Sequence, residues 1–226
     1  MTPVVIQLIN LFVALIISLS IHEFAHAWAA KVRGDDTAEQ EGRLTIFPGP
    51  HIDPFGTILF PLMGMASMAF MGLALPLFGW AKPVPVNLNN LKNRKWDHVF
   101  VAAAGPISNL ILCTLSILIA LMIVDSGTDV DHGSVGGGLI AFLRAMIGIN
   151  ALLAFFNLLP IPPLDGATVF SSLLPGDAGE RYERAIAPYG MIILVMLMLT
   201  GALKIVRIAS DSYTEGVFHL FAGFFS

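Results

Sequence analysis

Two histidines and one glutamate near the N-terminus have a spacing that suits a metal-dependent hydrolase. They form the run His22-Glu23-Phe24-Ala25-His26, in which the histidines are four positions apart. On a helix this spacing places both imidazoles on one face, where they can bind one zinc ion. Glu23 lies beside that face and can polarise a water on the metal. The run therefore predicts a zinc site with hydrolytic chemistry.

The residues that precede this run are apolar. Residues 11–21 carry no charged side chain, so the histidines and the glutamate lie within a segment that can span a membrane. An HExxH run also arises by chance on the solvated face of a soluble helix, which is the alternative interpretation. In hydrocarbon, however, an unliganded cluster of these side chains would cost several kcal/mol. The apolar surroundings therefore favour a functional metal site.

The composition is that of a membrane protein. Of the 226 residues, 56% are hydrophobic and 12% are charged, whereas about a quarter of the residues of a soluble domain are charged. The net charge is -4 and no basic cluster follows a surface, so nucleic acid is not an expected partner. The N-terminal residues lack a basic region, and we therefore expect the first apolar stretch to belong to the mature protein rather than to a cleaved targeting peptide.

Five apolar stretches are candidates for membrane-embedded segments, at about 4–30, 55–80, 98–124, 137–160 and 186–206. Lysines and arginines flank one set of ends, whereas the loop at 125–136 contains three aspartates and no basic residue. The positive-inside rule therefore predicts that the acidic loop is external and that the basic loops are cytoplasmic.

The stretch 55–80 does not fit a single crossing. If it crossed once, the basic loops before and after it would face opposite sides of the membrane. Helix-breaking residues interrupt it at Pro61, Gly64, Gly72 and Pro76. We therefore expect this stretch either to dip into the membrane and return or to lie at the interface.

The predicted fold is an all-α polytopic membrane protein, a bundle of about four to six transmembrane helices with this re-entrant or interfacial segment. The polar residues from Glu39 to Phe47 could form a short β element after the first helix. We expect residues 1–226 to form one domain.

A hydrolytic zinc site usually has three protein ligands, so a third residue must join the two histidines. Asp165 is the candidate, because it lies in the run Asn-Leu-Leu-Pro-Ile-Pro-Pro-Leu-Asp-Gly at 157–166, directly after the fourth apolar stretch. The prolines must end the helix there, which lets a carboxylate turn back into the bundle, and Gly166 allows close approach. The alternative is that Asp165 only caps the next helix.

Three motifs together resemble the signature motifs of the site-2 protease family of intramembrane zinc metalloproteases. They are the HExxH run, Gly105-Pro106-Ile107-Ser108-Asn109, and the run at 157–166. The runs at 50–54 and 80–87 are similar to runs in the compact bacterial and archaeal branch. This resemblance, which covers residues 22–166, implies hydrolysis of peptide bonds within or near transmembrane segments of membrane proteins, as in regulated intramembrane proteolysis.

The resemblance also implies roles for single residues. It makes Glu23 the catalytic acid and base, and it gives one zinc ion per chain the ligands His22, His26 and Asp165. It further implies that Asn109 and Asn157 contact the substrate or the oxyanion, for which hydrogen bonding between helices is the alternative. The active site would then lie toward the cytoplasmic side of the cell membrane.

Several features leave alternatives open. The connections are too short for a PDZ domain, and we expect no CBS-type domain after Arg207. The apolar residues 216–226 could lie in the membrane interface or pack on a second copy, which would make the protein a homo-oligomer. His51 and Asp53 could form a second metal site or a turn with a hydrogen bond between them. The alternative functions are a zinc transporter, which has no need of Glu23, and a non-catalytic membrane scaffold.

Overall fold

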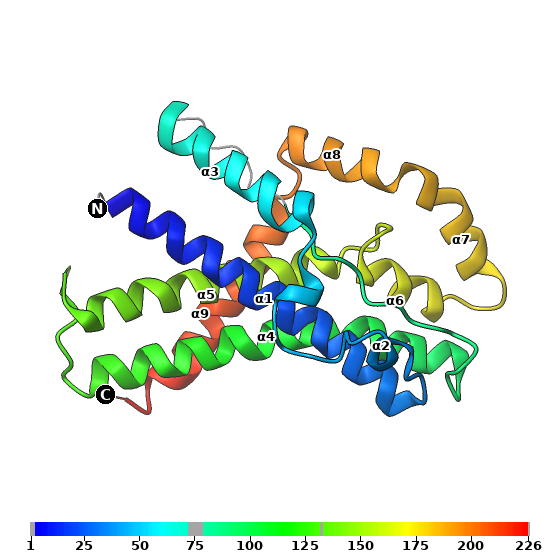
Figure 1. The fold of residues 1–226 in the computed structure, drawn as a ribbon, viewed down its shortest axis with the longest axis horizontal. Helices are drawn as coiled ribbons and strands as arrows, with labels where there is room; N and C mark the ends of the chain where they lie inside the picture. The colour runs from blue at the N-terminus through cyan, green and yellow to red at the C-terminus, as the bar shows by residue number, and fades with distance from the viewer. Residues whose placement is uncertain (1–2, 72–78, 132, 226) are drawn as a thin grey trace.

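The computed structural model describes residues 3–71, 79–131 and 133–225, which form helices joined by loops and one extended segment (Figure 1). The α-helices are α1 (Pro3–Arg33), α2 (Thr37–Gln40), α3 (Phe60–Met71), α4 (Arg94–Asp125), α5 (Val135–Asn157), α6 (Asp165–Leu173), α7 (Ala178–Ile186), α8 (Gly190–Thr200) and α9 (Lys204–Ala222). Shorter helical turns are η1 (Gly49–His51), η2 (Pro54–Leu59) and η3 (Ala187–Tyr189). The described residues contain no strand, and the predicted all-α class is confirmed.

Within the described residues, four helical segments are long and apolar enough to cross a membrane. They are Val4–Arg33, Arg94–Asp125, Val135–Asn157 and Ala178–Thr200. The last of these combines α7, η3 and α8. The chain is therefore a multi-pass membrane protein, with a number of candidate spans that falls within the predicted range.

Helices α1, α4 and α5 pack against one another and form the centre of the bundle (Figure 1). Small side chains lie at their contacts. Ala14 of α1 packs with Ala145 and Met146 of α5, and the pair Ala29 and Ala30 packs with Val101 of α4. Small residues allow membrane helices to approach closely, which is how these packed helices can bring polar side chains from all three into contact.

The two ends of the apolar stretch 55–80 lie side by side. The backbone N–H of Trp80 donates to the carbonyl of Gly56 at 3.3 Å, and the Thr57 hydroxyl donates to the carbonyl of Trp80 at 2.8 Å. The stretch therefore returns to the place where it starts and does not cross once, as predicted. Gly72 and Pro76, two of the expected breaks, lie outside the described residues.

Residues 79–87 are extended, and we call this segment the strap. The connection that follows α1 holds it. The N–H of Lys82 donates to the carbonyl of His51 at 2.9 Å. The Arg43 guanidinium donates to the carbonyls of Lys82 at 2.5 Å and Pro83 at 3.3 Å. Two of these three hydrogen bonds come from the Arg43 side chain, so a side chain makes most of the link between this connection and the strap.

The short β element suggested for Glu39 to Phe47 is absent, although all of these residues are described. The N–H of Arg43 donates to the carbonyl of Ala38 at 2.8 Å, within a turn. The strap could not offer a regular ladder to this segment, because Pro83 and Pro85 have no N–H to donate.

Helix α9 packs along α4 and α5 of the same chain. The hydroxyl oxygens of Tyr213 and Thr114 are 2.7 Å apart, and Val217 packs against the cluster of Cys113, Ile117 and Ala151. Phe218, Leu220 and Phe224 remain exposed on this helix and after it, so the interfacial or intermolecular position expected for residues 216–226 stays a prediction. The packing of α9 gives Cys113 the role of a small buried hydrophobic side chain.

Asp35 joins the end of α1 to the end of the strap. Its buried carboxylate accepts hydrogen bonds from the N–H of Asn87 at 2.7 Å and from the Asn90 amide at 2.9 Å. It also accepts from the hydroxyl of Thr37 at 2.5 Å. Burial alone would raise the pKa of Asp35, but these hydrogen bonds bring it below its ordinary value of 3.8.

Replacement of Asp35 by alanine should lower the free energy of unfolding by about 1–3 kcal/mol at neutral pH, because buried donors lose their acceptor. The pKa is lower in the folded state, so the stabilisation is full above the unfolded value of 3.8 and is lost as the pH falls through the folded value. Unfolding in detergent at neutral and acidic pH measures both effects. The control is Asp36→Ala, because Asp36 is exposed and makes no capping hydrogen bond. Equal losses in both variants would contradict this account.

Candidate metal centre and active site

Helix α1 presents the two predicted histidine ligands on one buried face. The rings of His22 and His26 lie edge to face with centroids 4.7 Å apart, and their Nε2 atoms are 3.1 Å apart. The exposed fractions of His22 and His26 are 5% and 8%. The four-residue spacing therefore has the consequence expected for a helix.

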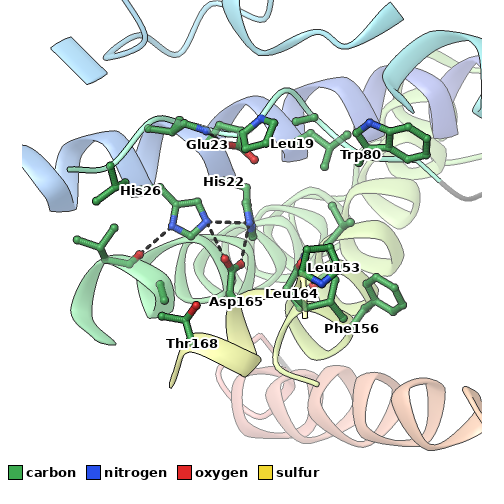
Figure 2. Close-up of a pocket in the computed structure, with 18 of the residues that line it drawn as sticks. Leu19, His22, Glu23, His26, Trp80, Leu153, Phe156, Leu164, Asp165 and Thr168 are labelled. Carbon is green, nitrogen blue, oxygen red and sulfur yellow. Dashed lines mark hydrogen bonds and ion pairs between the residues drawn. The ribbon is translucent and has the colours of Figure 1, made fainter. Parts of the chain in front are cut away.

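Asp165 faces the same point from the start of α6 (Figure 2). Its Oδ2 lies 3.1 Å from His22 Nε2, and its Oδ1 lies 3.4 Å from His26 Nε2. Leu164, not Asp165, is the capping residue of α6, and no side chain makes a capping hydrogen bond there. The capping alternative therefore does not describe the position of this carboxylate.

Gly166 allows α6 to begin close to the end of α5. A Cβ atom on Gly166 would lie 2.3 Å from the carbonyl oxygen of Leu158, closer than side chains approach backbone. The glycine after Asp165 is therefore required for the close approach predicted from the sequence, because it lets the carboxylate turn back toward α1.

Hydrogen bonds fix which ring nitrogen of each histidine faces the carboxylate. His26 Nδ1 lies 2.8 Å from the carbonyl oxygen of Val101, and His22 Nδ1 lies 2.6 Å from Oδ1 of Asn109. These oxygens only accept, so each Nδ1 carries a hydrogen, and in the neutral imidazole each Nε2 then carries a lone pair. Metal-binding histidines typically have this arrangement.

The three atoms that converge are suited to a cation. One Nε2 from each histidine and one carboxylate oxygen lie within 4.8 Å of one another. Apart from the 3.1 Å approach of His22 Nε2, the buried Oδ2 of Asp165 has no partner among the described residues. Lone pairs that face one another in a buried site repel unless a cation lies between them. Two nitrogen ligands and one carboxylate also leave a fourth position open, as in catalytic zinc sites.

Gly105 of α4 closes one side of this centre. A Cβ atom at this position would lie 2.4 Å from Nε2 of His26 and 2.6 Å from Nε2 of His22. Any side chain would therefore occupy the space beside the two nitrogen atoms. The glycine of the motif at 105–109 is explained by this contact.

Glu23 is held by the strap. Its Oε2 accepts a hydrogen bond from the backbone N–H of Val84 at 3.0 Å, and the residue is 9% exposed. Val84 stands between Pro83 and Pro85, so it has the one N–H that these three residues can donate. The contact between Glu23 and Val84 was not predicted from the sequence, although the Pro-Val-Pro pattern at 83–85 is a visible signal of an extended segment.

A cavity of about 440 Å³ opens beside the centre. Apolar side chains make up much of its wall. Besides Glu23 and the three converging residues, it is lined by Leu19, His98, Leu153, Phe156, Asn157, Thr168, Met191 and Leu194 and by residues of the strap. The cavity therefore joins the centre to side chains of α1, α4, α5, α6 and α8.

The two asparagines proposed as substrate contacts lie in different places. Asn157 lines the cavity, and its amide donates to the carbonyl of Leu153 at 3.0 Å. Asn109 is fully buried behind His22 and does not line the cavity. This placement differs from the expected contact between Asn109 and substrate, because its oxygen is used to orient His22.

His51 and Asp53 have separate structural roles. Nε2 of His51 lies 2.8 Å from the carbonyl oxygen of Thr45. Nδ1 of His51 has no hydrogen-bond partner among the described residues. The Asp53 carboxylate caps η2 by accepting from the N–H groups of Phe55 and Gly56. Neither the expected hydrogen bond between them nor a second metal cluster is present in the described part of the chain.

Comparison with known proteins identifies similar sequences. The family model for peptidase family M50 matches residues 10–128 and 121–200. "Putative zinc metalloprotease YwhC" of Bacillus subtilis is 38% identical over 190 residues, which cover 84% of this chain and 80% of that protein. "Putative zinc metalloprotease Rip2" of Mycobacterium tuberculosis is 33% identical over 192 residues, which cover 84% of this chain and 66% of that protein. No solved structure matches the chain.

Replacement of Gly105 by alanine should abolish zinc binding without unfolding the protein. The new methyl group would fill the space beside both Nε2 atoms, whereas alanine favours the helix by about 1 kcal/mol relative to glycine. The measurement is zinc content of the purified variant together with its thermal stability. Gly148→Ala on α5 is the matched control, because a Cβ atom there meets nothing within 4 Å. Full zinc content in Gly105→Ala would disprove the proposed position of the metal.

Replacement of Asp165 by alanine should also reduce bound zinc strongly, since the carboxylate is the third converging ligand. Competition with a coloured chelator gives the affinity and the stoichiometry. A variant that keeps one zinc ion per chain with wild-type affinity would remove Asp165 from the ligand set.

Proposed function

Because the chain belongs to peptidase family M50, the family of the site-2 proteases, we propose that it hydrolyses peptide bonds within or near the transmembrane segments of membrane proteins. In this proposal the zinc ligands are His22, His26 and Asp165, and the catalytic base is Glu23. The observation that carries the proposal is the convergence of two imidazole nitrogens and a carboxylate oxygen within 4.8 Å, with Glu23 lining the same cavity.

The ligand set suits zinc in a hydrolytic role. Zinc held by two histidines and one carboxylate would supply a Lewis acid that polarises the scissile carbonyl and makes the attacking water more acidic. The residues of the chain position this chemistry. Val101 and Asn109 hold the imidazoles in the tautomer that presents Nε2, and α6 supplies the carboxylate.

Glu23 is placed to move the proton. The N–H of Val84 occupies Oε2 of Glu23 and leaves Oε1 to take a proton from the attacking water. The same oxygen then delivers that proton to the nitrogen of the departing amine. The strap orients the base, because Val84 donates from a backbone segment that Arg43 and His51 hold at neighbouring positions.

A transmembrane substrate must open its helix before it can react. The carbonyl groups of a membrane helix are engaged in its own hydrogen bonds, so glycine or proline near the cleaved bond would favour reaction by weakening the helix. The apolar cavity can accept the released side chains. Asn157 uses one amide hydrogen for Leu153 and retains a second that can stabilise the developing oxyanion.

We place the active site toward the cytoplasmic side of the membrane. Lys31 and Arg33 lie in the last turn of α1, and Arg94 and Lys95 begin α4. The loop with the three aspartates follows the opposite end of α4 (Figure 1). The positive-inside rule assigns the basic ends to the cytoplasm.

Replacement of Glu23 by glutamine should leave zinc bound and reduce cleavage at least about 100-fold, because the amide cannot act as a base. Its oxygen can still accept from Val84, so the strap should stay in place. The assay is cleavage of a panel of single-span membrane proteins by purified protein in detergent, with zinc measured on the same samples. The matched control is Glu41→Gln at an exposed position.

Cleavage by Glu23→Gln at the wild-type rate would show that another residue is the base. Zinc binding with no cleavage of any panel member by the wild type would favour a zinc transporter or a non-catalytic scaffold over the protease.

A further inference from the structure

A chain of buried amide side chains connects α5 to the proposed zinc site. Asn150 of α5 and Asn109 of α4 are both fully buried. The Asn109 amide nitrogen lies 2.8 Å from Oδ1 of Asn150, and the Asn109 oxygen lies 2.6 Å from Nδ1 of His22. Asn150 touches neither the converging ligand atoms nor the cavity. Its hydrogen-bond connection to the centre runs through Asn109.

The direction of these hydrogen bonds follows from a backbone carbonyl at the far end. The amide nitrogen of Asn150 lies 2.8 Å from the carbonyl oxygen of Met146. A carbonyl oxygen can only accept, so the NH₂ group of Asn150 must face Met146. The oxygen of Asn150 must then face Asn109, and it too can only accept.

Asn109 transmits this constraint to His22. Its NH₂ group faces the oxygen of Asn150 at 2.8 Å and the carbonyl oxygen of Ser18 at 3.3 Å. Its own oxygen is therefore left to face Nδ1 of His22, which must carry the hydrogen. The remaining nitrogen, Nε2, then has the lone pair that a metal requires.

We propose that Asn150 is a positioning residue that sets the tautomer of His22 by fixing the orientation of the Asn109 amide. The proposal rests on the proposed zinc site. Of the two acceptors that hold the NH₂ group of Asn109, Asn150 is the nearer by 0.5 Å, as the distances of 2.8 and 3.3 Å show. Without it the Asn109 amide can rotate and present a donor to Nδ1, which would place the hydrogen of His22 on Nε2.

The test measures zinc affinity by chelator competition in the purified full-length protein. Asn150→Leu removes the acceptor and keeps a side chain of similar length. Asn150→Ser has a hydroxyl that can satisfy the Met146 carbonyl but is too short to reach Asn109, and small polar residues are well tolerated in membrane helices. Both variants should bind zinc about 10- to 100-fold more weakly than the wild type, as is typical when a partner behind a metal ligand is lost.

Thr114→Val is the matched control. It removes a half-buried polar contact between α4 and α9, the 2.7 Å hydrogen bond with Tyr213, and this contact includes no atom of His22. Its zinc affinity should stay within about twofold of the wild type, because it shares no partner with the zinc site. If a serine or leucine at 150 behaves like this control, the proposal is overturned.

A spectroscopic measurement tests the tautomer directly. Nitrogen NMR of metal-free wild-type protein with labelled histidine should show His22 with the hydrogen on Nδ1, and Asn150→Ser should show a mixture of both tautomers. A wild-type signal for hydrogen on Nε2 would overturn the proposal even if both variants failed to fold. Failure of the wild type to bind zinc at all would instead overturn the proposed function.

Discussion

Lone pairs that face one another in a low-dielectric interior are the constraint on which the rest of the structure depends. His22, His26 and Asp165 direct three electron-rich atoms toward one point, and a cation between them, as in the proposed zinc site, would relieve their mutual repulsion. The surrounding residues keep hydrogen atoms and side chains away from the point at which these three atoms converge. Acceptors behind the imidazoles hold the hydrogens on the far nitrogens, and Gly105 keeps the shared space clear of side-chain atoms.

The positions of the helices follow from the same constraint. Helices α1, α4 and α5 approach closely enough to bring the two histidines together with the buried amides of Asn109 and Asn150, and alanines at the contacts of α1 with α4 and α5 permit this. Helix α6 adds Asp165. The strap has a different role, because the base proposed here, Glu23, needs a fixed orientation without a competing charge in an apolar site. A single backbone N–H, from Val84, provides it. Prolines on both sides of Val84 have no N–H, so Val84 alone of these three residues can donate.

Local patterns predicted much of the fold and the residues that converge. The histidine spacing fixes a helix face, and the proline run at 157–166 marks the turn that carries Asp165. The supporting partners could not be predicted in this way, because His22 and Asn109 are 87 positions apart and Val84 is 61 positions from Glu23. Such pairs form only when distant segments are aligned in one particular way, and the periodic pattern within a single segment does not reveal that alignment. The resemblance to a family indicated Asn109 but not its position behind His22.

The closure of the stretch 55–80 on itself makes it an arm that branches from the bundle instead of a link within it. Residues 56 and 80 are hydrogen-bonded neighbours, so residues added between them would cost little more than loop entropy, which grows slowly with length. The turn between Asn157 and Asp165 has no such freedom, since one inserted residue there would carry the carboxylate away from the histidines. Relatives should therefore differ in length at the arm long before they differ at the turn.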